Sequence, residues 1–390
     1  MKIALFHNLP SGGAKRAVFE WVKQLSKIHK IDLYIFNEES EATWNIKPFV
    51  NRTFIQNKTQ ETFLNNRNKL ISLIPLIFLS KKLANKIDDG KYDLVLTMQC
   101  KITNSPFLLR FLKTPSVFIC HESMTRVLEP HYPKKNIIFP FNWIRKIGLN
   151  FFIGIDKKNA NCANSICTTS FYSRDRLYLC YGLFPKLIYP GVDTNFFKPI
   201  KKISRKKTIL SVGSLFPSKG HDFVIEAIGK INKSQRPNLK VIHGSHQYLN
   251  SYKVKLNMLA VKHDVKVTFV SSIDDQTLLK EYNSSIVTAC ANFLEPLGLV
   301  ALESMACGTP VVAIAEAGLR ETVINNKNGI LTERDALEFS KAIMVLIKNQ
   351  QKWNQISKNG IRCVLDKWTW ELSAKSLDTY LKSFIEKKLS

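Results

Sequence analysis

The sequence lacks the features that mark three common classes of protein. Its eight cysteines form no CxxC pair, have no histidine at zinc-finger spacing, and mostly lie in apolar runs. Reduced cysteines in such runs act as small hydrophobic side chains, so we predict a cytoplasmic protein with neither a disulfide framework nor a metal site. The longest apolar run, residues 70–79, is about half a membrane span and contains Pro75. The amino-terminal run breaks at Pro10, which is typical of a strand rather than a secretory signal.

Acidic residues are also scarce. The chain of 390 residues has 31 Asp and Glu against 57 Lys and Arg, a net charge of +26. Residues 1–190 hold 28 basic and 13 acidic side chains, an excess of 15, and the remainder holds 29 and 18, an excess of 11. Such a field attracts phosphates, anionic membranes or nucleic acid. Because the charge forms no recognisable nucleic-acid-binding module or stripe, we predict no nucleic-acid partner.

Strand and helix patterns alternate along the chain, and the pattern starts twice. Residues 2–8 are typical of a buried strand, and a Ser-Gly-Gly loop and a helix pattern over residues 15–28 follow. The pattern restarts with a strand over residues 208–214. Strands that alternate with helices predict parallel βαβ units, so the expected fold class is α/β with two Rossmann-like, doubly wound parallel sheets. The further strands predicted are residues 31–36, 92–98, 116–120, 164–170, 238–245, 265–271, 285–291 and 309–315.

A turn-rich segment around Pro190-Gly191 separates the two halves. We therefore predict an amino-terminal domain over residues 1–188, a carboxyl-terminal domain over residues 189–365, and a final amphipathic helix over residues 366–390. Ligands of doubly wound sheets bind at the carboxyl ends of the strands, so two facing domains would place an active site in the cleft between them.

Two glutamates flank a Pro-Leu-Gly turn in the segment NFLEPLGLVALESMACGTPVV. The turn opens a helix, so the N–H groups of Leu297, Gly298 and Leu299 lack intrahelical acceptors and can hold a diphosphate. A carboxylate beside an anion is repelled unless it binds hydroxyl groups, so Glu295 and Glu303 suit a sugar on one side and a ribose on the other. An ordinary helix start, with Glu303 as a solvated helix residue, is the alternative interpretation.

Two further loops follow strands where anions can bind. Gly12 and Gly13 precede the first predicted helix, whose free N–H groups can receive an anion. The loop is not GxGxxG, and no acidic residue ends the second strand, so a dinucleotide site has little support and a tight turn explains the glycines equally well. In SVGSLFPSKG, Lys219 lies just ahead of a helix and can reach a phosphate as a point charge.

Together these segments resemble the family 4 retaining glycosyltransferases of GT-B fold, also grouped as group 1. EPLGLVALESMACGTPVVA is similar to their E-x7-E signature. The other similar segments stand in the family order over nearly the whole chain: the Gly-Gly loop, CHESMTR, TTSFYSRDRL, YPGVDTNFFKP, SVGSLFPSKGHD and AGLRETVINNKNGIL. Some members end in a helix that crosses back to the first domain, and residues 366–390 resemble it.

The resemblance implies a role for each matching residue. Glu295 would contact the hydroxyls of the donor sugar, Glu303 would bind the ribose, and Lys219 would neutralise the leaving diphosphate. His121 matches a histidine that lies near the donor sugar, although a lone histidine after a strand is more typical of a structural residue. The remaining residues implied to contact the donor are Gly12, Gly13, Gly213, Ser214, Gly244, Leu297, Gly298 and Leu299.

One position departs from the family pattern. The family usually has Arg where this chain has Ser214, in SVGSL. Arg and Lys together normally carry the diphosphate charge, so the loss should weaken leaving-group stabilisation, and Arg320 and Lys207 are candidates to replace it. The implied reaction is a retaining transfer from a UDP- or GDP-linked sugar. It uses no cofactor and no metal, since the sequence has no DxD-like pair in a suitable loop.

The acceptor side is less defined. Residues 131–154 mix Lys134, Lys135, Arg145 and Lys146 with aromatic side chains. This composition favours peripheral contact with the inner face of an anionic membrane, near a glycan or lipid-linked acceptor of cell-envelope synthesis. A core helix with a basic edge is the alternative. The competing hypotheses for the whole chain are an epimerase-like sugar-nucleotide enzyme, an inactive donor-binding relative and a nucleic-acid-binding protein.

Overall fold

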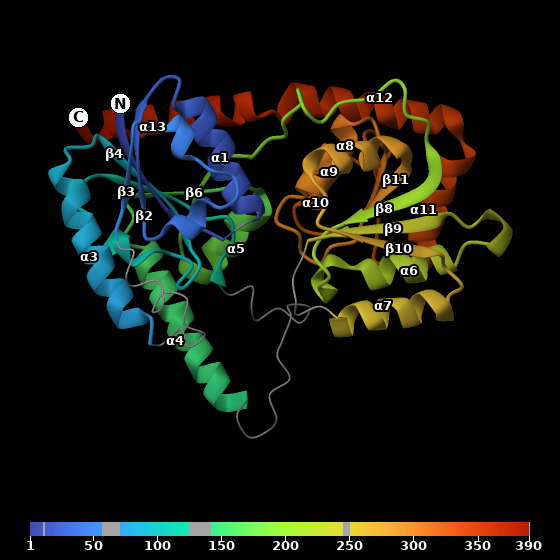
Figure 1. Cartoon of the computed structure of the whole chain (residues 1–390), viewed down its shortest axis with the longest axis horizontal. Coiled ribbons are helices and arrows are strands. Elements are labelled where there is room, and N and C mark those ends of the chain that lie inside the picture. Colours follow the sequence, from blue (N-terminus) through green and yellow to red (C-terminus); the bar gives the residue numbers. More distant parts are fainter. Residues whose placement is uncertain (11, 57–70, 125–141, 245–249, 390) are drawn as a thin grey trace. The chain divides into compact units, whose positions relative to one another are not determined.

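The computed structural model describes residues 1–10, 12–56, 71–124, 142–244 and 250–389 (Figure 1). The described residues form two compact units. The first contains those from Met1 to Pro190 together with those from Trp370 to Leu389, and the second contains those from Gly191 to Thr369. The final helix therefore belongs to the first unit, although it follows the second in sequence. None of the described helices is both long enough and apolar enough to cross a membrane.

The first unit is built on a parallel sheet with the strand order β3-β2-β1-β4-β5-β6-β7. Its strand β1, which lies between β2 and β4, has the fully buried apolar run from Ile3 to Phe6, because helices cover both faces of a parallel sheet. The strands are β1 (Lys2–Asn8), β2 (Lys30–Ile35), β3 (Arg52–Ile55), β4 (Leu94–Cys100), β5 (Ser116–Ile119), β6 (Ser165–Thr168) and β7 (Lys186–Leu187). The helices are α1 (Gly13–Leu25), α3 (Leu73–Asp89), α4 (Asn142–Ala160), α5 (Phe171–Tyr181) and α13 (Trp370–Leu389), with short 3₁₀ helices η1 (Glu38–Glu41), η2 (Lys47–Phe49) and η3 (Phe107–Arg110).

Helix α13 packs along α1, as Figure 1 shows. The ring of Trp21 meets that of Trp370 edge to face, with centroids 6.0 Å apart. Trp21 Nε1 also donates to Ser373 Oγ at 2.7 Å, and Ser373 Oγ donates to the carbonyl of Tyr189. The apolar residues of the last helix, Leu377 and others, are thereby buried in the core of the first unit.

The second unit repeats the architecture with a parallel sheet in the order β10-β9-β8-β11-β12-β13. Its strands are β8 (Lys206–Val212), β9 (Asn238–His243), β10 (Val267–Ser271), β11 (Ser285–Cys290), β12 (Val311–Ile314) and β13 (Ile330–Thr332). Its helices are α6 (His221–Gly229), α7 (Asn250–Lys262), α8 (Asp275–Ser284), α9 (Leu299–Ala306), α10 (Leu319–Thr322), α11 (Ala336–Lys348) and α12 (Gln350–Lys367), with 3₁₀ helices η5 (Pro217–Lys219) and η6 (Lys233–Gln235).

Both sheets have the strand order of a dinucleotide-binding fold, and the order reverses beside the first strand of each. The prediction of two doubly wound, Rossmann-like parallel sheets is thus confirmed. All eight cysteines are free, and five of them are buried.

Candidate functional site

The strand order of the second unit indicates where a ligand binds. β8 and β11 are neighbours at the point where the order reverses, and ligands of doubly wound sheets bind outside the carboxyl ends of such strands. The loop after β8 carries Lys219, and the loop after β11 carries Glu295. Two residues predicted from separate motifs therefore meet at one edge of one sheet.

Lys219 and Glu295 form an ion pair. Lys219 Nζ lies 2.9 Å from Glu295 Oε2, and Asn292 Nδ2 donates to the same oxygen at 2.6 Å. The two charged side chains are 26% and 19% exposed, so each is within reach of a bound molecule. Asn292 was not predicted from the sequence, although it opens the motif and lies three residues before Glu295.

Glycines allow these loops to approach closely. Gly220 has a positive φ of 68°, and a Cβ there would lie 2.1 Å from the carbonyl oxygen of Ala291. Phe293 N donates to Ser218 O at 2.8 Å beside this contact. A side chain at position 220 would collide with the backbone at Ala291, so glycine lets the two loops pack this closely.

Gly213 lies against the stem of Lys219, and Ser214 follows it in the same turn. A Cβ on Gly213 would lie 3.3 Å from Lys219 Cδ, so its absence leaves room for the lysine stem. His221 Nε2 lies 3.3 Å from the carbonyl oxygens of Gly213 and Ser214, and its Nδ1 lies 2.9 Å from Ser211 Oγ. Burial lowers the pKa of His221 to about 4, so a neutral imidazole fixes this turn.

The structure separates the two candidates to replace the missing arginine. Lys207 lies near the start of β8, at the edge of the sheet opposite Lys219, so it is placed wrongly for this role. Arg320 is exposed on α10. The residue that caps α10, Gly318, donates its N–H to Glu295 O at 2.9 Å. Arg320 therefore remains the candidate, and its role stays a prediction.

Helix α9 begins at Leu299, and its cap Gly298 has a positive φ of 92°. A Cβ on Gly298 would lie 2.6 Å from Leu319 Cδ2, so glycine is needed here too. The first bonds of the helix run from Ala301 N and Leu302 N to Gly298 O, at 3.0 and 3.3 Å. The N–H groups of Leu297, Gly298 and Leu299 precede these bonds, as the sequence predicted.

Glu303 is 5% exposed inside α9, so its interpretation as a solvated helix residue is wrong. Its Oε2 accepts a hydrogen bond of 2.8 Å from Tyr282 Oη, which belongs to α8. Burial raises the pKa of Tyr282, which keeps the phenol a donor. The two glutamates of the motif thus accept hydrogen bonds from different side chains, Lys219 and Asn292 for Glu295 and Tyr282 for Glu303.

Gly244 lies at the same edge of the sheet, after β9. Gly213 N donates to Ile242 O at 3.0 Å, which ties the ends of β8 and β9 together. His243 Nδ1 lies 2.9 Å from the carbonyl oxygen of Gly244.

The other predicted residues lie in the first unit. Gly12 caps α1 with a φ of 150°, a conformation that favours glycine, and no atom lies within 4 Å of where its Cβ would be. Gly13 begins α1. The open space above this loop is compatible with a bound molecule. That these residues meet those of the second unit in one cleft stays a prediction.

His121 follows β5 and stacks on Trp21, with ring centroids 6.1 Å apart and planes at 16°. Its Nε2 is a buried atom without a hydrogen-bond partner among the described residues. Burial lowers the pKa of His121 to about 4. Gln99 holds the backbone here: its Oε1 accepts from His121 N at 3.3 Å, and its Nε2 donates to Glu122 O at 2.8 Å.

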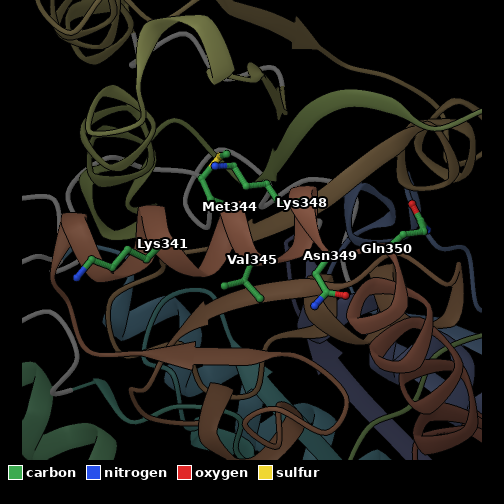
Figure 2. Close-up of a pocket in the computed structure, with 6 residues that line it drawn as sticks. All are labelled: Lys341, Met344, Val345, Lys348, Asn349 and Gln350. Atoms are coloured by element: carbon green, nitrogen blue, oxygen red, sulfur yellow. The ribbon is translucent and has the colours of Figure 1, made fainter.

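A depression of about 600 Å³ in the second unit lies elsewhere (Figure 2). It is lined by α11 and the start of α12, through Lys341, Met344, Val345, Lys348, Asn349 and Gln350. None of the predicted site residues lines it, and its lining contains two lysines but no carboxylate that could bind sugar hydroxyls. The cluster around Lys219 therefore remains the candidate site.

Part of the predicted membrane-facing segment lies outside the described residues. Residues 131–141 are among these, with Lys134 and Lys135, and the side chain of Arg145 is not described either. Lys146 is exposed on α4.

Comparison with known proteins gives a family-profile match over the second unit, sequence matches to relatives over about half of the chain, and structural similarity over the whole chain. Residues 192–362 match the family profile described as glycosyl transferases group 1. An uncharacterised glycosyltransferase of Methanocaldococcus jannaschii is 32% identical over 215 residues, which are 52% of this chain and 54% of the relative. A GDP-mannose-dependent α-(1-6)-phosphatidylinositol monomannoside mannosyltransferase of Mycobacterium tuberculosis is 27% identical over 231 residues, 55% of this chain and 60% of the relative.

Over the whole chain, the fold is similar to that of HepE from Anabaena, solved in complex with UDP and glucose. The TM-score is 0.75 at 19% identity, covering 98% of this chain and 100% of HepE. This similarity shows the fold, with two Rossmann-like units as in GT-B proteins. The matches to the curated relatives, by contrast, span only about half of those proteins.

Proposed function

We propose that the protein is a glycosyltransferase, which transfers a sugar from a nucleotide-sugar to an acceptor hydroxyl; the match of residues 192–362 to the glycosyl transferases group 1 profile supports this. The observation that carries the proposal is the cluster of Lys219, Glu295 and Asn292 at the switch point of the second sheet. A cation, a carboxylate and an open helix start together match the phosphate and hydroxyl groups of a sugar diphosphate.

Each part of the donor has a complementary group. The N–H groups at the start of α9 and Lys219 would hold the diphosphate, and Glu303 would accept hydrogen bonds from the ribose. Glu295 would then orient the hydroxyls of the donor sugar. HepE was solved with UDP and the Mycobacterium relative is named GDP-mannose-dependent, which supports a UDP- or GDP-linked donor.

The proposed reaction retains the configuration of the sugar. The bond between the anomeric carbon and the diphosphate breaks while the acceptor oxygen bonds to the same face, and the acceptor proton passes to the leaving phosphate. Lys219 and the positive end of α9 stabilise the charge that develops on that phosphate, in place of a metal ion. Glu295 acts by orientation and not as a covalent nucleophile. The neutral imidazole of His121 would contact the donor sugar.

The function is tested by nucleotide release. The protein is incubated with a panel of UDP- and GDP-sugars and a chelator, with and without a membrane lipid extract. We expect release that depends on donor and on acceptor, and a Glu303→Ala variant that binds the donor about 10-fold or more weakly, since a hydrogen bond to a charged group is lost. Binding of no sugar nucleotide would refute the function. Nucleotide release that does not require the extract would favour hydrolysis of the donor, and interconversion of donor sugars without net release would favour an epimerase-like enzyme.

We also propose that the first unit contacts an anionic membrane through α3 and α4. Both helices pack on η3, and both expose apolar side chains. Phe78 is 70% exposed and Ile74 67% on α3, and Phe151 is 52% exposed on α4. Exposed lysines flank these side chains: Lys81, Lys82, Lys86, Lys146, Lys157 and Lys158. Apolar side chains beside a basic rim are typical of helices that lie in a membrane interface. The acceptor would then be a lipid-linked glycan or a glycolipid.

Replacing Ile74 and Phe78 by Glu together is expected to weaken sedimentation with anionic vesicles by about 10-fold or more, because two apolar side chains that would enter the membrane are lost and the two new negative charges are repelled. The matched control is Met258→Glu with Val261→Glu, a pair that is 69% and 82% exposed on α7 of the second unit. The membrane contact is wrong if both double variants sediment like the parent, or if both lose binding equally.

A further inference from the structure

Arg334 lies at the carboxyl edge of the second sheet, just after β13. Its guanidinium donates two parallel hydrogen bonds to Glu316, which follows β12: Nε donates to Oε1 at 2.7 Å and Nη2 donates to Oε2 at 2.8 Å. A planar guanidinium matches a carboxylate in this geometry, and an ammonium does not.

The same guanidinium also reaches the loop after β11. Nη1 donates to the carbonyl of Ala291 at 2.9 Å, and Nη2 donates to that of Asn292 at 3.2 Å. The guanidinium carbon lies 3.6 Å from the centroid of the Phe293 ring. One side chain therefore ties together the loops that follow three adjacent strands of the sheet.

Those loops fix Glu295 from two directions. From the β11 loop, Asn292 Nδ2 donates to the carboxylate of Glu295 at 2.6 Å. From the β12 loop, Gly318 N donates to the backbone oxygen of Glu295 at 2.9 Å, and a Cβ on Gly318 would lie 2.0 Å from Pro296 O. Arg334 binds the backbone oxygen of Asn292 itself, and it binds Glu316, which lies two residues before Gly318.

We propose that Arg334 is a positioning residue that sets the Glu295 carboxylate against the donor sugar. The inference rests on the proposed function, because it assigns Arg334 an effect on sugar transfer through Glu295 and Asn292. Arg334 belongs to neither the diphosphate nor the ribose contacts. Its loss therefore changes how the sugar is oriented, while the nucleotide remains bound as before.

The test compares Arg334→Lys with Arg236→Lys. Arg236 lies in the same sheet domain, just before β9, where it donates to the carbonyls of Gly229, Ile231, His263 and Asp264. It is an arginine that clamps loops at the opposite, amino edge of the sheet. Loss of loop clamping alone should affect the two variants alike.

We expect Arg334→Lys to lower kcat for transfer by about 10- to 100-fold and to blur the preference among donor sugars, because Glu295 is no longer held in its reactive orientation. The affinity for the free nucleoside diphosphate, measured by calorimetry, should match that of the parent. Glu316→Gln, which loosens the same clamp, should show the same split between kcat and nucleotide affinity. Arg236→Lys should keep the parental kcat and sugar preference.

Two results separate this inference from the proposed function. A parent protein that transfers sugar, with Arg334→Lys and Glu316→Gln no slower than Arg236→Lys, overturns the positioning role alone. A parent protein that binds no sugar nucleotide overturns the proposed function and the positioning role together. Nucleotide affinity that falls as steeply as kcat in Arg334→Lys also overturns the role, since it shows a general loss of the site.

Discussion

Lys219→Met is expected to lower kcat for sugar transfer by about 10²- to 10³-fold, the effect of removing one preorganised group that stabilises developing charge. In the structure Lys219 Nζ is held 2.9 Å from Glu295, so the ammonium is already in place before a donor arrives. Ser214 brings no positive charge to the turn beside Lys219, which leaves Lys219 a larger share of the diphosphate charge in the proposed reaction. The measurement is steady-state transfer at saturating concentration of the best donor of the panel.

A second ion pair of the same unit supplies the control. Lys240 Nζ lies 2.8 Å from Glu281. The side chains of these two residues are 27% and 20% exposed, close to the values for Lys219 and Glu295. Lys240→Met removes the same charge and the same kind of contact away from the loops after β8 and β11. It should leave kcat unchanged. If the two lysine variants turn over at the same rate, Lys219 does not stabilise the leaving group.

Charge alone does not explain the expected size of the effect. Lys219→Arg keeps the positive charge but spreads it over a planar fork that cannot replace the ammonium as a point donor. It should recover part of the lost rate. Glu295→Gln should also lower kcat, because the amide has no charge and one accepting oxygen where the carboxylate has two. A higher kcat for Lys219→Arg than for Lys219→Met would show that the loss of rate comes from the missing positive charge beside the diphosphate.

The fold could be predicted from the sequence because its central strands are long and apolar on both faces. β1, β4, β8 and β11 all lie within or beside the predicted ranges, and the repeated strand–loop–helix order implied parallel sheets. The strands that were missed, β3, β7 and β13, are short and lie at or next to an edge of a sheet. Edge strands bury little apolar surface, so hydrophobic pattern gives little signal for them.

The candidate site could be predicted only in part. Glu295 and Lys219 stand in segments with a recognisable local pattern, and the sheet topology then brings those segments together. Tyr282, which donates to Glu303, and Arg334 stand in ordinary helix and loop sequences. Tyr282 lies 21 residues from Glu303 in the sequence, and Arg334 lies 18 to 43 residues from its partners. Only the folded arrangement of the loops therefore reveals these contacts. Asn292 is different, because its position three residues before Glu295 is a local signal.

Glu41→Ala is expected to destabilise the first unit by about 3–5 kcal/mol, the cost of leaving one partner of a buried ion pair without the other. Lys15 and His7 are 0% exposed, and Glu41 is 6% exposed. Lys15 Nζ contacts Glu41 Oε1 and lies 3.1 Å from His7 Nε2. Glu41 Oε2 also accepts from Ile46 N at 2.6 Å. Truncation would leave a lysine buried in the first turn of α1, where the helix dipole also opposes a positive charge.

Denaturant unfolding of the whole chain tests this, followed by the amide hydrogen exchange of β1 and α1, which reports on the first unit. The double variant Lys15→Met with Glu41→Leu is the control, because apolar side chains of similar volume replace the pair and leave no charge behind. Its stability should lie within about 1 kcal/mol of the parent, since such replacements are often neutral. Equal destabilisation of the single and double variants would show that shape, and not charge, makes the cluster important.

The same cluster should make the first unit sensitive to acid. Burial raises the pKa of Glu41, but the hydrogen bonds from His7 and Lys15 outweigh it, and the net shift is downward. The pKa of His7 is also lowered, in its case by burial. Both groups therefore bind protons more readily in the unfolded chain, so stability is present above their unfolded pKa values and is lost as the pH falls. The loss should begin below the histidine value of about 6.5 and deepen below about 4.5, where Glu41 protonates in the unfolded chain. In the double variant His7 is the only member of the cluster left to titrate, so the loss below about 4.5 should be shallower than in the parent while the loss below about 6.5 persists. Asp32 and Asp378, whose pKa values are also lowered, still contribute to the loss in acid.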